Sequence, residues 1–217
     1  MPPRPWDAVI FDYGRVLSRA PTPAETQELA ALVGVSEPPF FQLYSDTRDD
    51  YDRGRHDHRQ HWQRFAQAAG IVLSATQIER IVELETRMWL QVNPEALELA
   101  RYIKKSGIRT AILSNMPADL LHHLRRSFAW LDEFEVQIWS CEHGVIKPDP
   151  AIYRICLDAL GCPPQRALFF DDRPNNVDGA RRAGIEAYVF SSAGQAAGIV
   201  RTGLQGPAER HRKSAPE

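Results

Sequence analysis

The sequence predicts an α/β fold with a Rossmann-like open parallel sheet and a helical subdomain inserted after the first strand. Three observations support this prediction: short apolar runs that end in polar residues recur, punctuated helices lie between them, and the stretch 19–91 carries helix signals only. Continuous apolarity is typical of strands buried on both faces, and strands that alternate with helices indicate a parallel sheet with right-handed crossovers.

The strands of the predicted sheet differ in their apolar pattern. Continuous apolar runs predict central strands over 8–11, 111–113 and 167–170, and a further strand over 187–190. The segment around Val136 alternates instead, with Phe134 and Ile138 as the neighbouring apolar positions. Alternation favours a strand nearer an edge of the sheet.

The helices between these strands begin and end with recognisable residues. Asn93 and Pro94 open a helix over 95–105, and Asp149 and Pro150 open another of the same design. A glycine follows each helix within two residues of its end. A capping residue, a proline at the first helical position and a terminal glycine are the expected punctuation of a helix.

The stretch 19–91 is predicted to form a helical cap over the active edge of the sheet. Thr22 with Glu25, and Ser74 with Gln77, make capping boxes that open two of its helices. Small and charged residues prevail at the C-terminal end of the chain. The predicted organisation is an α/β core over 1–18 and 92–192, the cap over 19–91, and a flexible tail over 193–217.

Composition excludes several classes of function. The 217 residues carry a formal net charge of only −2, which gives no electrostatic reason to expect nucleic acid or an anionic membrane as a partner. No apolar stretch approaches the roughly 20 residues of a membrane span, and MPPRPW lacks the apolar region of a signal peptide. Three cysteines without metal-ligand spacing suit a reducing compartment. We therefore expect a cytoplasmic protein, monomeric or homodimeric, with a small-molecule partner.

Polar residues follow the apolar runs at the edge of the sheet where ligands of open α/β folds bind. They are Asp12, Ser114, Asn115, Asp171 and Asp172. A carboxylate can attack a phosphoryl group and form an aspartyl-phosphate, which makes Asp12 the candidate nucleophile. Mg²⁺ held by Asp12 and the acidic pair would offset their mutual repulsion.

Donors for the phosphate group are also expected at this edge. Ser114 and the backbone N–H groups at the start of the following helix would bind the phosphate oxygens. Lys147 would supply the remaining positive charge as the transition state forms.

Four segments in order, FDYGRVL, ILSN, GVIKPDPAIY and LFFDDRPNNVDGARRAG, resemble the four motifs of the haloacid dehalogenase-like (HAD) hydrolase superfamily. A cap between the first and second motifs resembles subclass I of that superfamily. The motif wording is most similar to its glucose-1-phosphatase-like sugar-phosphate phosphatases. The resemblance covers nearly the whole chain, and it implies a Mg²⁺-dependent hydrolase of small phosphomonoesters.

The resemblance also implies residue roles. Asp12 is the nucleophile and a metal ligand, the Gly14 carbonyl and Asp172 bind Mg²⁺ directly, and Asp171 binds it directly or through water. The remaining implied roles are phosphate binding for Ser114 and Asn115, and catalysis with phosphate contact for the motif-three lysine, Lys147.

Gly14 departs from the pattern, because most phosphatases of this superfamily carry a general acid aspartate two positions after the nucleophile. Without this acid, either turnover is slow, or the leaving group departs without protonation, or a residue of the cap donates the proton. The candidate donors are Asp46, Asp50, Asp52, His56 and Asp57. Two rival functions are a 2-haloacid dehalogenase, which the adjacent acidic pair disfavours, and a HAD-fold binding protein without turnover.

Several conspicuous residues have ordinary structural interpretations. His58 and His61 share a helix face in HDHRQH, but a third ligand with zinc spacing is missing, so a solvated cap face is favoured. Phe40, Phe41 and Trp89 are expected to pack in the cap or between cap and sheet, with one of them able to touch substrate.

Overall fold

The computed structural model describes residues 5–210 and contains one five-stranded parallel sheet with the strand order β3-β2-β1-β4-β5. The strands are β1 (Ala8–Phe11), β2 (Arg109–Ser114), β3 (Val136–Trp139), β4 (Ala167–Asp171) and β5 (Glu186–Val189). The predicted α/β class and all five strands are confirmed. The segment with alternating polarity, β3, is an edge strand, and β1 lies at the centre.

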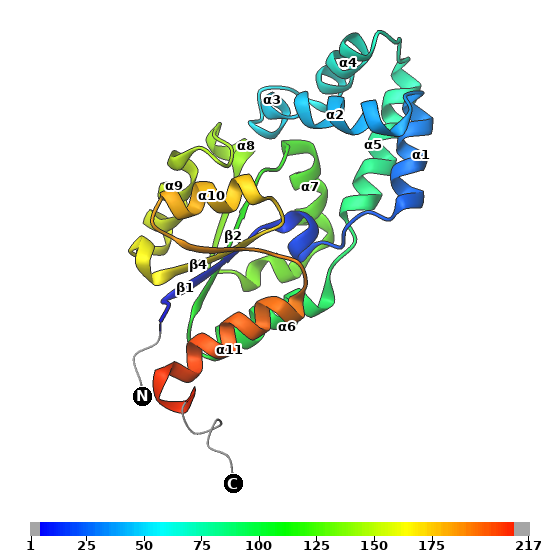
Figure 1. Cartoon of the computed structure of the whole chain (residues 1–217). Coiled ribbons are helices and arrows are strands. Elements are labelled where there is room, and N and C mark those ends of the chain that lie inside the picture. The colour runs from blue at the N-terminus through cyan, green and yellow to red at the C-terminus, as the bar shows by residue number, and fades with distance from the viewer. Residues whose placement is uncertain (1–4, 211–217) are drawn as a thin grey trace.

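Helices cover both faces of the sheet, so the core is a three-layer sandwich (Figure 1). Val9 and Phe11 point to the face covered by α6 (Pro94–Lys105), α7 (Ala118–Ser127) and α11 (Ala193–Arg210). Ala8 and Ile10 point to the other face, which α9 (Pro150–Leu160) and α10 (Pro174–Arg182) cover. Burial on both faces explains why β1 is apolar throughout. Short helical turns complete the core: α8 (Ser140–His143), η2 (Ala129–Glu133) and η3 (Pro164–Arg166).

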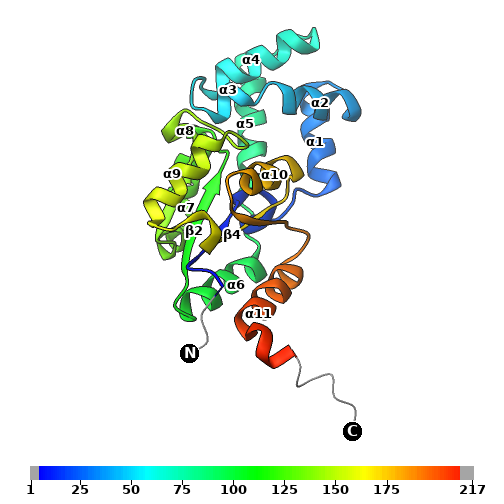
Figure 2. The ribbon, with the colours of Figure 1, turned by 60° about the vertical axis from the view of Figure 1, so that its left-hand side comes forward.

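Five helices between Pro23 and Trp89 form a separate group above the sheet, which we call the helical layer (Figures 1 and 2). They are α1 (Pro23–Val33), α2 (Glu37–Asp46), α3 (Asp49–Asp52), α4 (His58–Ala69) and α5 (Ala75–Trp89). Both predicted capping boxes are present, at the starts of α1 and α5. The layer has its own hydrophobic cluster, centred on Trp62, Phe65 and Ile81. This cluster contains only residues of the layer, so the layer has a hydrophobic core separate from that of the sheet.

The helical layer is joined to the core by two linkers that lie side by side. Ser18 and Val92 form an isolated antiparallel bridge, and the Arg19 N–H donates to the Gln91 carbonyl over 2.6 Å. This backbone pairing fixes where the chain leaves the core and where it re-enters.

A second contact joins the layer to the core on the opposite side. The Ser140 hydroxyl donates to the Asp52 carbonyl over 2.5 Å. Gly54 has a φ of +72°, and a Cβ added to it would lie 2.7 Å from the Cys141 carbonyl oxygen. Only glycine allows this approach, because it accepts positive φ and lacks the clashing atom.

The predicted flexible tail is wrong over most of its length. The structure forms helix α11 there, and Ala193, Ala196 and Val200 are buried against the core around Trp6. These small and branched residues recur at helical spacing, and the packing they gain outweighs the weak helix propensity of the interspersed glycines. The last part of the predicted tail, 211–217, lies outside the described residues.

The interpretation of the histidine-rich segment as a solvated face is wrong for His61. This side chain is fully buried and stacks on Tyr51 with ring centroids 4.4 Å apart. Burial lowers the pKa of His61 to about 3, so the ring is neutral at physiological pH. His58 instead contacts the core, with its Nδ1 3.3 Å from the Asp119 carboxylate of α7. In the described part of the chain, no helix is long and apolar enough to cross a membrane.

Candidate active site

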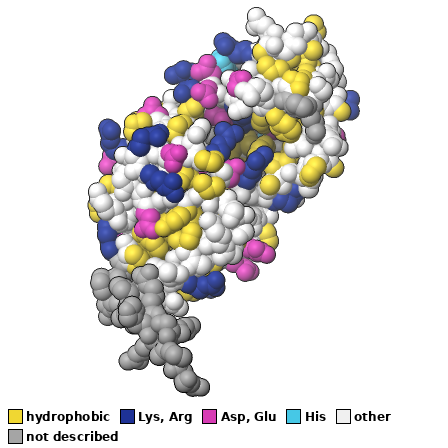
Figure 3. Space-filling model, in the orientation of Figure 1, with side chains coloured by type: hydrophobic (Ala, Val, Ile, Leu, Met, Phe, Trp, Pro, Cys, Tyr) yellow, Lys and Arg dark blue, Asp and Glu magenta, His cyan; other side chains and the backbone are white. Residues whose placement is uncertain are grey.

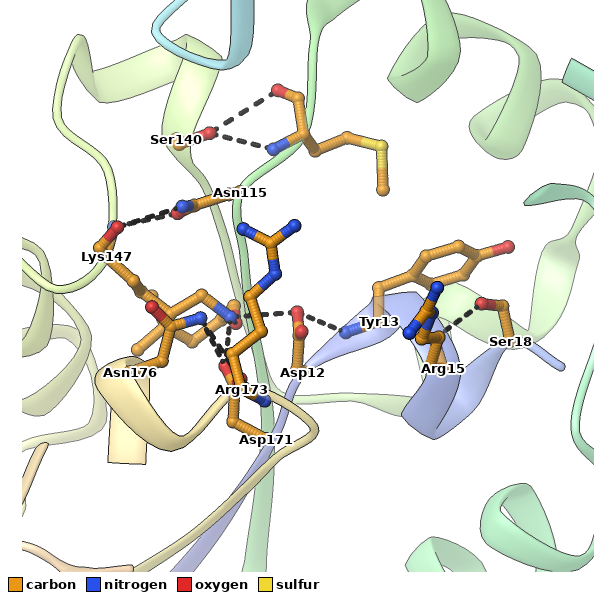
Figure 4. Close-up of polar contacts among 12 residues, drawn as sticks. Asp12, Tyr13, Arg15, Ser18, Asn115, Ser140, Lys147, Asp171, Arg173 and Asn176 are labelled. Atoms are coloured by element: carbon orange, nitrogen blue, oxygen red, sulfur yellow. Dashed lines mark hydrogen bonds and ion pairs between the residues drawn. The ribbon is translucent and has the colours of Figure 1, made fainter. Parts of the chain in front are cut away.

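The carboxyl ends of β1, β2 and β4 bring the candidate residues together, as the strand order requires (Figure 4). Directly after β1 the chain makes a tight turn, η1 (Tyr13–Leu17), which the Ser18 N–H closes by donating to the Tyr13 carbonyl over 2.8 Å, and in which Arg15 adopts a positive φ of 58°. Such a conformation is strained for a residue with a Cβ, and strained backbone is frequent at functional sites. The turn exposes Gly14 to the cavity described below.

Asp12 is buried at the end of β1, and one of its oxygens is held firmly. Oδ1 accepts a hydrogen bond from the Tyr13 N–H over 2.7 Å and lies 2.9 Å from Nζ of Lys147. Among the described residues, Oδ2 has no hydrogen-bond donor. The carboxylate is therefore fixed in orientation while one oxygen stays available for chemistry.

Lys147 is also buried, and protein acceptors use all three of its N–H bonds. Nζ lies 2.9 Å from Asp12 Oδ1, 2.6 Å from Asp171 Oδ2 and 2.9 Å from the Leu113 carbonyl oxygen. A lysine engaged in this way stabilises negative charge nearby without reaching out to it. Its expected contact with a phosphate group is therefore electrostatic in this arrangement.

The acidic pair after β4 splits into two different environments. The fully buried Asp171 accepts hydrogen bonds from the Arg173 N–H, the Asn176 side chain and Lys147, so both of its oxygens are occupied. Asp172 is less buried, and its nearest cation is the Arg15 guanidinium at 3.9 Å. Asp172 is thus the freer of the two carboxylates.

Negative charge is in excess at this edge of the sheet. Asp12, Asp171 and Asp172 offer ligand oxygens that all lie within 4.8 Å of one another, and we call them with Lys147 the sheet-edge cluster. Burial, partly offset by Lys147 and reinforced by the two other carboxylates, raises the pKa of Asp12 to about 7. Burial and Asp171 raise the pKa of Asp172 as well. Oxygen donors with an uncompensated negative charge suit Mg²⁺.

The predicted phosphate ligands lie in the site with different freedom. Ser114 lines the cavity, and its hydroxyl has no protein partner among the described residues. Asn115 instead binds the backbone of Lys147 on both sides: its Nδ2 donates to the Lys147 carbonyl over 3.0 Å, and its Oδ1 accepts from the Lys147 N–H over 2.7 Å. We expect Asn115 to position Lys147 in addition to any contact with phosphate.

The expectation that the start of the next helix donates to phosphate meets a structural obstacle. α7 begins three residues after Asn115, with Pro117 at its cap, and the Met116 N–H donates to the Ser140 hydroxyl over 2.8 Å (Figure 4). Proline has no N–H group and that of Met116 is already used, so this loop offers fewer free donors than the sequence suggested.

A cavity of about 200 Å³ lies between the sheet edge and the helical layer. Asp12, Ser114, Lys147 and Asp172 form part of its floor. Its roof comes from helices α1, α2, α3 and α5 and includes both aromatic residues and Arg48. The floor residues are placed to bind an anionic group of a ligand, and the roof residues are placed to contact the rest of that ligand.

Of the five cap residues considered as proton donors, only Asp52 lines this cavity among the described residues. Asp46, Asp50 and His56 border a separate hollow, and Asp57 caps helix α4. Asp52 forms an ion pair of 2.9 Å with Arg48, and both of its carboxylate oxygens accept hydrogen bonds from that guanidinium. It is therefore poorly suited to donate a proton.

Sequence reasoning missed two groups of cavity residues. Arg15 and Arg173, both shown in Figure 4, line the cavity, and Arg15 lies 3.9 Å from Asp172. Their positions beside the first and fourth motifs could have suggested this placement. Arg48 is largely buried and contacts Tyr44, Asp52 and Glu85, and we call these four residues the arginine cluster. The spacing of Arg48 and Asp52 was legible on one helical face, but the contact with Glu85 depends on the packing of α5 against α2 and α3.

Two curated relatives carry phosphatase names. A family model described as haloacid dehalogenase-like hydrolase matches residues 7–184. Phosphatase MT3486 of Mycobacterium tuberculosis is 32% identical over 125 residues, which cover 57% of this chain and 58% of that protein. The chain thus matches little more than half of that relative's length. The Phosphorylated carbohydrates phosphatase of Thermotoga maritima is 27% identical over 198 residues, covering 83% of this chain and 82% of that protein.

Solved structures that either bind phosphate or carry a dehalogenase name share the fold. The HAD family enzyme BT-2542 of Bacteroides thetaiotaomicron, in complex with magnesium and inorganic phosphate, aligns with a TM-score of 0.64 at 20% identity, covering 85% of this chain and 93% of that chain. The L-2-haloacid dehalogenase RSc1362 aligns with a TM-score of 0.73 at 16% identity, covering 90% of this chain and 99% of that chain. The fold alone therefore does not choose between phosphate and haloacid.

Proposed function

The chain belongs to the haloacid dehalogenase-like hydrolases, and on that premise we propose that it is a Mg²⁺-dependent phosphatase of a small phosphorylated metabolite. The observation that carries the proposal is the sheet-edge cluster, in which a buried nucleophile candidate, Asp12, lies between a lysine and two further carboxylates. The phosphatase names of both curated relatives support the same choice. The open hydroxyl of Ser114 adds a donor for a phosphate oxygen.

The donor set fits a magnesium ion. Three carboxylates and one lysine leave an excess of two negative charges, and the described oxygens lie close enough to share one cation. We propose Asp12 and Asp172 as direct ligands together with the Gly14 carbonyl, and Asp171 as a ligand through water because its oxygens are already occupied. A bound Mg²⁺ supplies positive charge that keeps the carboxylates ionised and offsets the charge of a phosphate group.

The protein's own residues divide the reaction between them. Oδ2 of Asp12 attacks phosphorus and forms a new O–P bond while the bond to the leaving oxygen breaks. Lys147 stabilises the charge that develops on Asp12 and the phosphoryl group, and Ser114 donates to a phosphoryl oxygen. Water then attacks the aspartyl-phosphate, which releases inorganic phosphate and restores the Asp12 carboxylate.

The departing oxygen must still acquire a proton, and Gly14 cannot provide it. Asp52 is held by Arg48, so we propose that solvent protonates the leaving group. Substrates whose leaving groups are weak bases, such as acyl and aryl phosphates, should then turn over fastest.

We propose that the helical layer acts as the cap of this enzyme, with the core over 1–18 and 92–192 and the cap over 19–91. Its separate hydrophobic cluster and the two paired linkers support this division. The roof of the cavity belongs to this layer, so the layer would select the organic group of the substrate.

The test is phosphate release from acetyl phosphate and p-nitrophenyl phosphate with Mg²⁺ or with EDTA. We expect EDTA to abolish release, and Asp12→Asn to lower it at least about 10³-fold, because the amide is a poor nucleophile. Asp178→Asn is the matched control, since this carboxylate is exposed on α10 and pairs only with Arg181 among the described residues. Release that survives EDTA or Asp12→Asn would contradict the proposal.

Two rival functions have their own outcomes in the same assay. Halide release from 2-chloropropionate without metal would instead establish a dehalogenase, which the excess of carboxylates around Asp12 disfavours. Binding of phosphate without turnover of any ester would indicate a HAD-fold binding protein.

A further inference from the structure

The roof of the cavity is rich in aromatic and aliphatic side chains. Phe40 and Phe41 come from α2, Met88 and Trp89 from α5, and Leu29 from α1, and we call these five residues the apolar roof. Phe41 is 41% exposed, although it is one of the largest apolar side chains of the layer. Figure 3 shows hydrophobic side chains on the helical-layer side of the hollow and charged side chains on the sheet side. The two walls of the cavity therefore differ in chemistry.

The polar groups of the same roof already have protein partners. The Arg48 guanidinium donates to Asp52, Glu85 and the Tyr44 hydroxyl, and the Tyr44 hydroxyl in turn donates to Glu85. The Thr26 hydroxyl donates to a backbone carbonyl of its own helix over 2.9 Å. A polyol would need such donors and acceptors for its hydroxyls, because a hydroxyl buried without a partner costs free energy.

One polar roof residue remains open, and it is at the rim. Ser45 lines the cavity without a side-chain partner in the described chain, and it is exposed to solvent. Arg15 and Arg173 lie on the floor of the cavity, Arg15 at 3.9 Å from Asp172, and their charge suits the phosphate end of a ligand. The roof thus offers a ligand mainly apolar contact area.

We infer that the substrate of this site is a phosphomonoester whose organic group is a hydrocarbon, alkyl or aryl, and not a sugar. The inference rests on the proposed phosphatase function and specifies its substrate class. The phosphate group would lie on the charged floor, and the hydrocarbon would lie against Phe41 and Trp89, with the rest of the apolar roof behind them. Removal of apolar area from water would then supply the binding energy of the organic group.

A matched pair of substrates tests this inference. Cyclohexylmethyl phosphate and glucose 6-phosphate are both esters of a primary alcohol on a six-membered ring, but only the sugar carries ring hydroxyls. With Mg²⁺ present, we expect kcat/KM to be at least about tenfold higher for cyclohexylmethyl phosphate. Equal values, or a preference for the sugar, would overturn the inference while leaving the phosphatase function intact.

Binding of the corresponding phosphonates separates the two proposals. Cyclohexylmethylphosphonate should bind the Mg²⁺-loaded protein about tenfold more tightly than the phosphonate analogue of glucose 6-phosphate, measured by calorimetry. This preference without turnover of any ester would overturn the proposed function and retain the ligand class. Equal affinities would overturn the ligand class.

Two substitutions of exposed apolar residues in the helical layer locate the effect. Phe41→Ser should lower the ratio of the two kcat/KM values about fivefold, because contact area with the ring is lost. Val72→Ser is the matched control, since Val72 is 92% exposed and lies outside the cavity, and its ratio should stay unchanged. A ratio that survives Phe41→Ser would overturn the assignment of the apolar roof.

Discussion

Two buried ionic clusters face the same cavity, and they differ in how completely their charges are compensated. The arginine cluster contains one guanidinium and two carboxylates, and Nε, Nη1 and Nη2 of Arg48 each donate to an acceptor within it. The sheet-edge cluster contains one ammonium and three carboxylates, and Oδ2 of Asp12 has no donor among the described residues. The first cluster is closer to neutral and closed, whereas the second is short of positive charge and open.

The degree of charge compensation distinguishes a structural ion cluster from a functional one. Close packing of opposite charges raises the pKa of Arg48 well above its usual range and locks three elements of the helical layer together. Burial, reinforced by the two neighbouring carboxylates, instead raises the pKa of Asp12 to about 7, so a bound cation would relieve unfavourable interactions at this site. Incomplete compensation, and not burial alone, marks the site of chemistry.

Lys147→Met should have the largest effect, because it removes the single cation of the sheet-edge cluster. We expect kcat to fall about 10²- to 10³-fold, as for the loss of a preorganised charge in an active site. The Mg²⁺ concentration for half-maximal stabilisation should fall, because three carboxylates then attract the ion without competition from the lysine. Steady-state kinetics and metal titration of thermal unfolding measure both effects, with the exposed Lys105→Met as control. An unchanged kcat would show that the charge of Lys147 in the sheet-edge cluster does not contribute to catalysis.

Gly14→Asp should increase turnover by adding the missing acid to the sheet-edge side. The φ of Gly14 is −63°, and a Cβ there would meet Trp89 at 3.7 Å, an ordinary contact, so the side chain fits without strain. We expect kcat for alkyl phosphates to rise about 10- to 100-fold, and that for acetyl phosphate to rise much less. No gain on alkyl phosphates would show that protonation of the leaving group does not limit the rate.

Arg48→Met should affect stability and leave chemistry nearly intact. Two buried carboxylates, Asp52 and Glu85, would lose their partner, which costs about 3 to 5 kcal/mol and lowers the melting temperature by roughly 6 to 15 °C. Adding Asp52→Asn and Glu85→Gln should restore much of this loss, because the uncompensated charges are then gone. Calorimetry measures the stability, and kcat for acetyl phosphate measures the chemistry. If kcat fell further than it does in Lys147→Met, the arginine cluster would be the more important of the two for catalysis.

The smallest effect concerns pH and the metal-free protein. The pKa of Asp12 is raised in the folded state, so its contribution favours folding below about pH 4 and is lost as pH rises to about 7. The Asp12→Asn variant has no ionisable group at this position, so its stability does not fall for this reason as pH rises. In EDTA the melting temperature of the variant relative to wild type should therefore rise by about 5 °C between pH 5 and pH 8. If the difference in melting temperature between variant and wild type did not change with pH, the pKa of Asp12 would not be raised in the folded protein.

The sequence was sufficient for the sheet and for the meeting of its strand ends, because both follow from local patterns. Continuous apolar runs identified β1, β2 and β4, and parallel strands bring their carboxyl ends to one edge, so Asp12 and Asp171 had to approach each other. Capping boxes likewise located the starts of α1 and α5. The functional roles of these residues stay predictions.

What the sequence did not show depends on packing between segments far apart in the chain. Three tertiary contacts are examples. Arg48 pairs with Glu85, His61 is buried against Tyr51, and the Asn115 side chain forms hydrogen bonds with the Lys147 backbone. Helix α11 was missed because its apolar stripe is made largely of alanines, whose burial only becomes favourable once the core surface is present. Helix propensity and composition carry no information on any of these partners.

The paired linkers at Ser18 and Val92 matter for how the chain finds its fold. Strand β1 must pair with β2 across the whole insertion, as in the register of Ala8 with Arg109. The hydrophobic cluster of α1, α2, α4 and α5 lies entirely within the insertion, so its early assembly would bring the two linkers together and reduce the loop that the sheet must close. Loop-closure entropy grows with the logarithm of loop length, so this shortening favours nucleation of the sheet. The same geometry makes the insertion exchangeable: another helical unit with equally close ends could be grafted between Ser18 and Val92 without disturbing strand register.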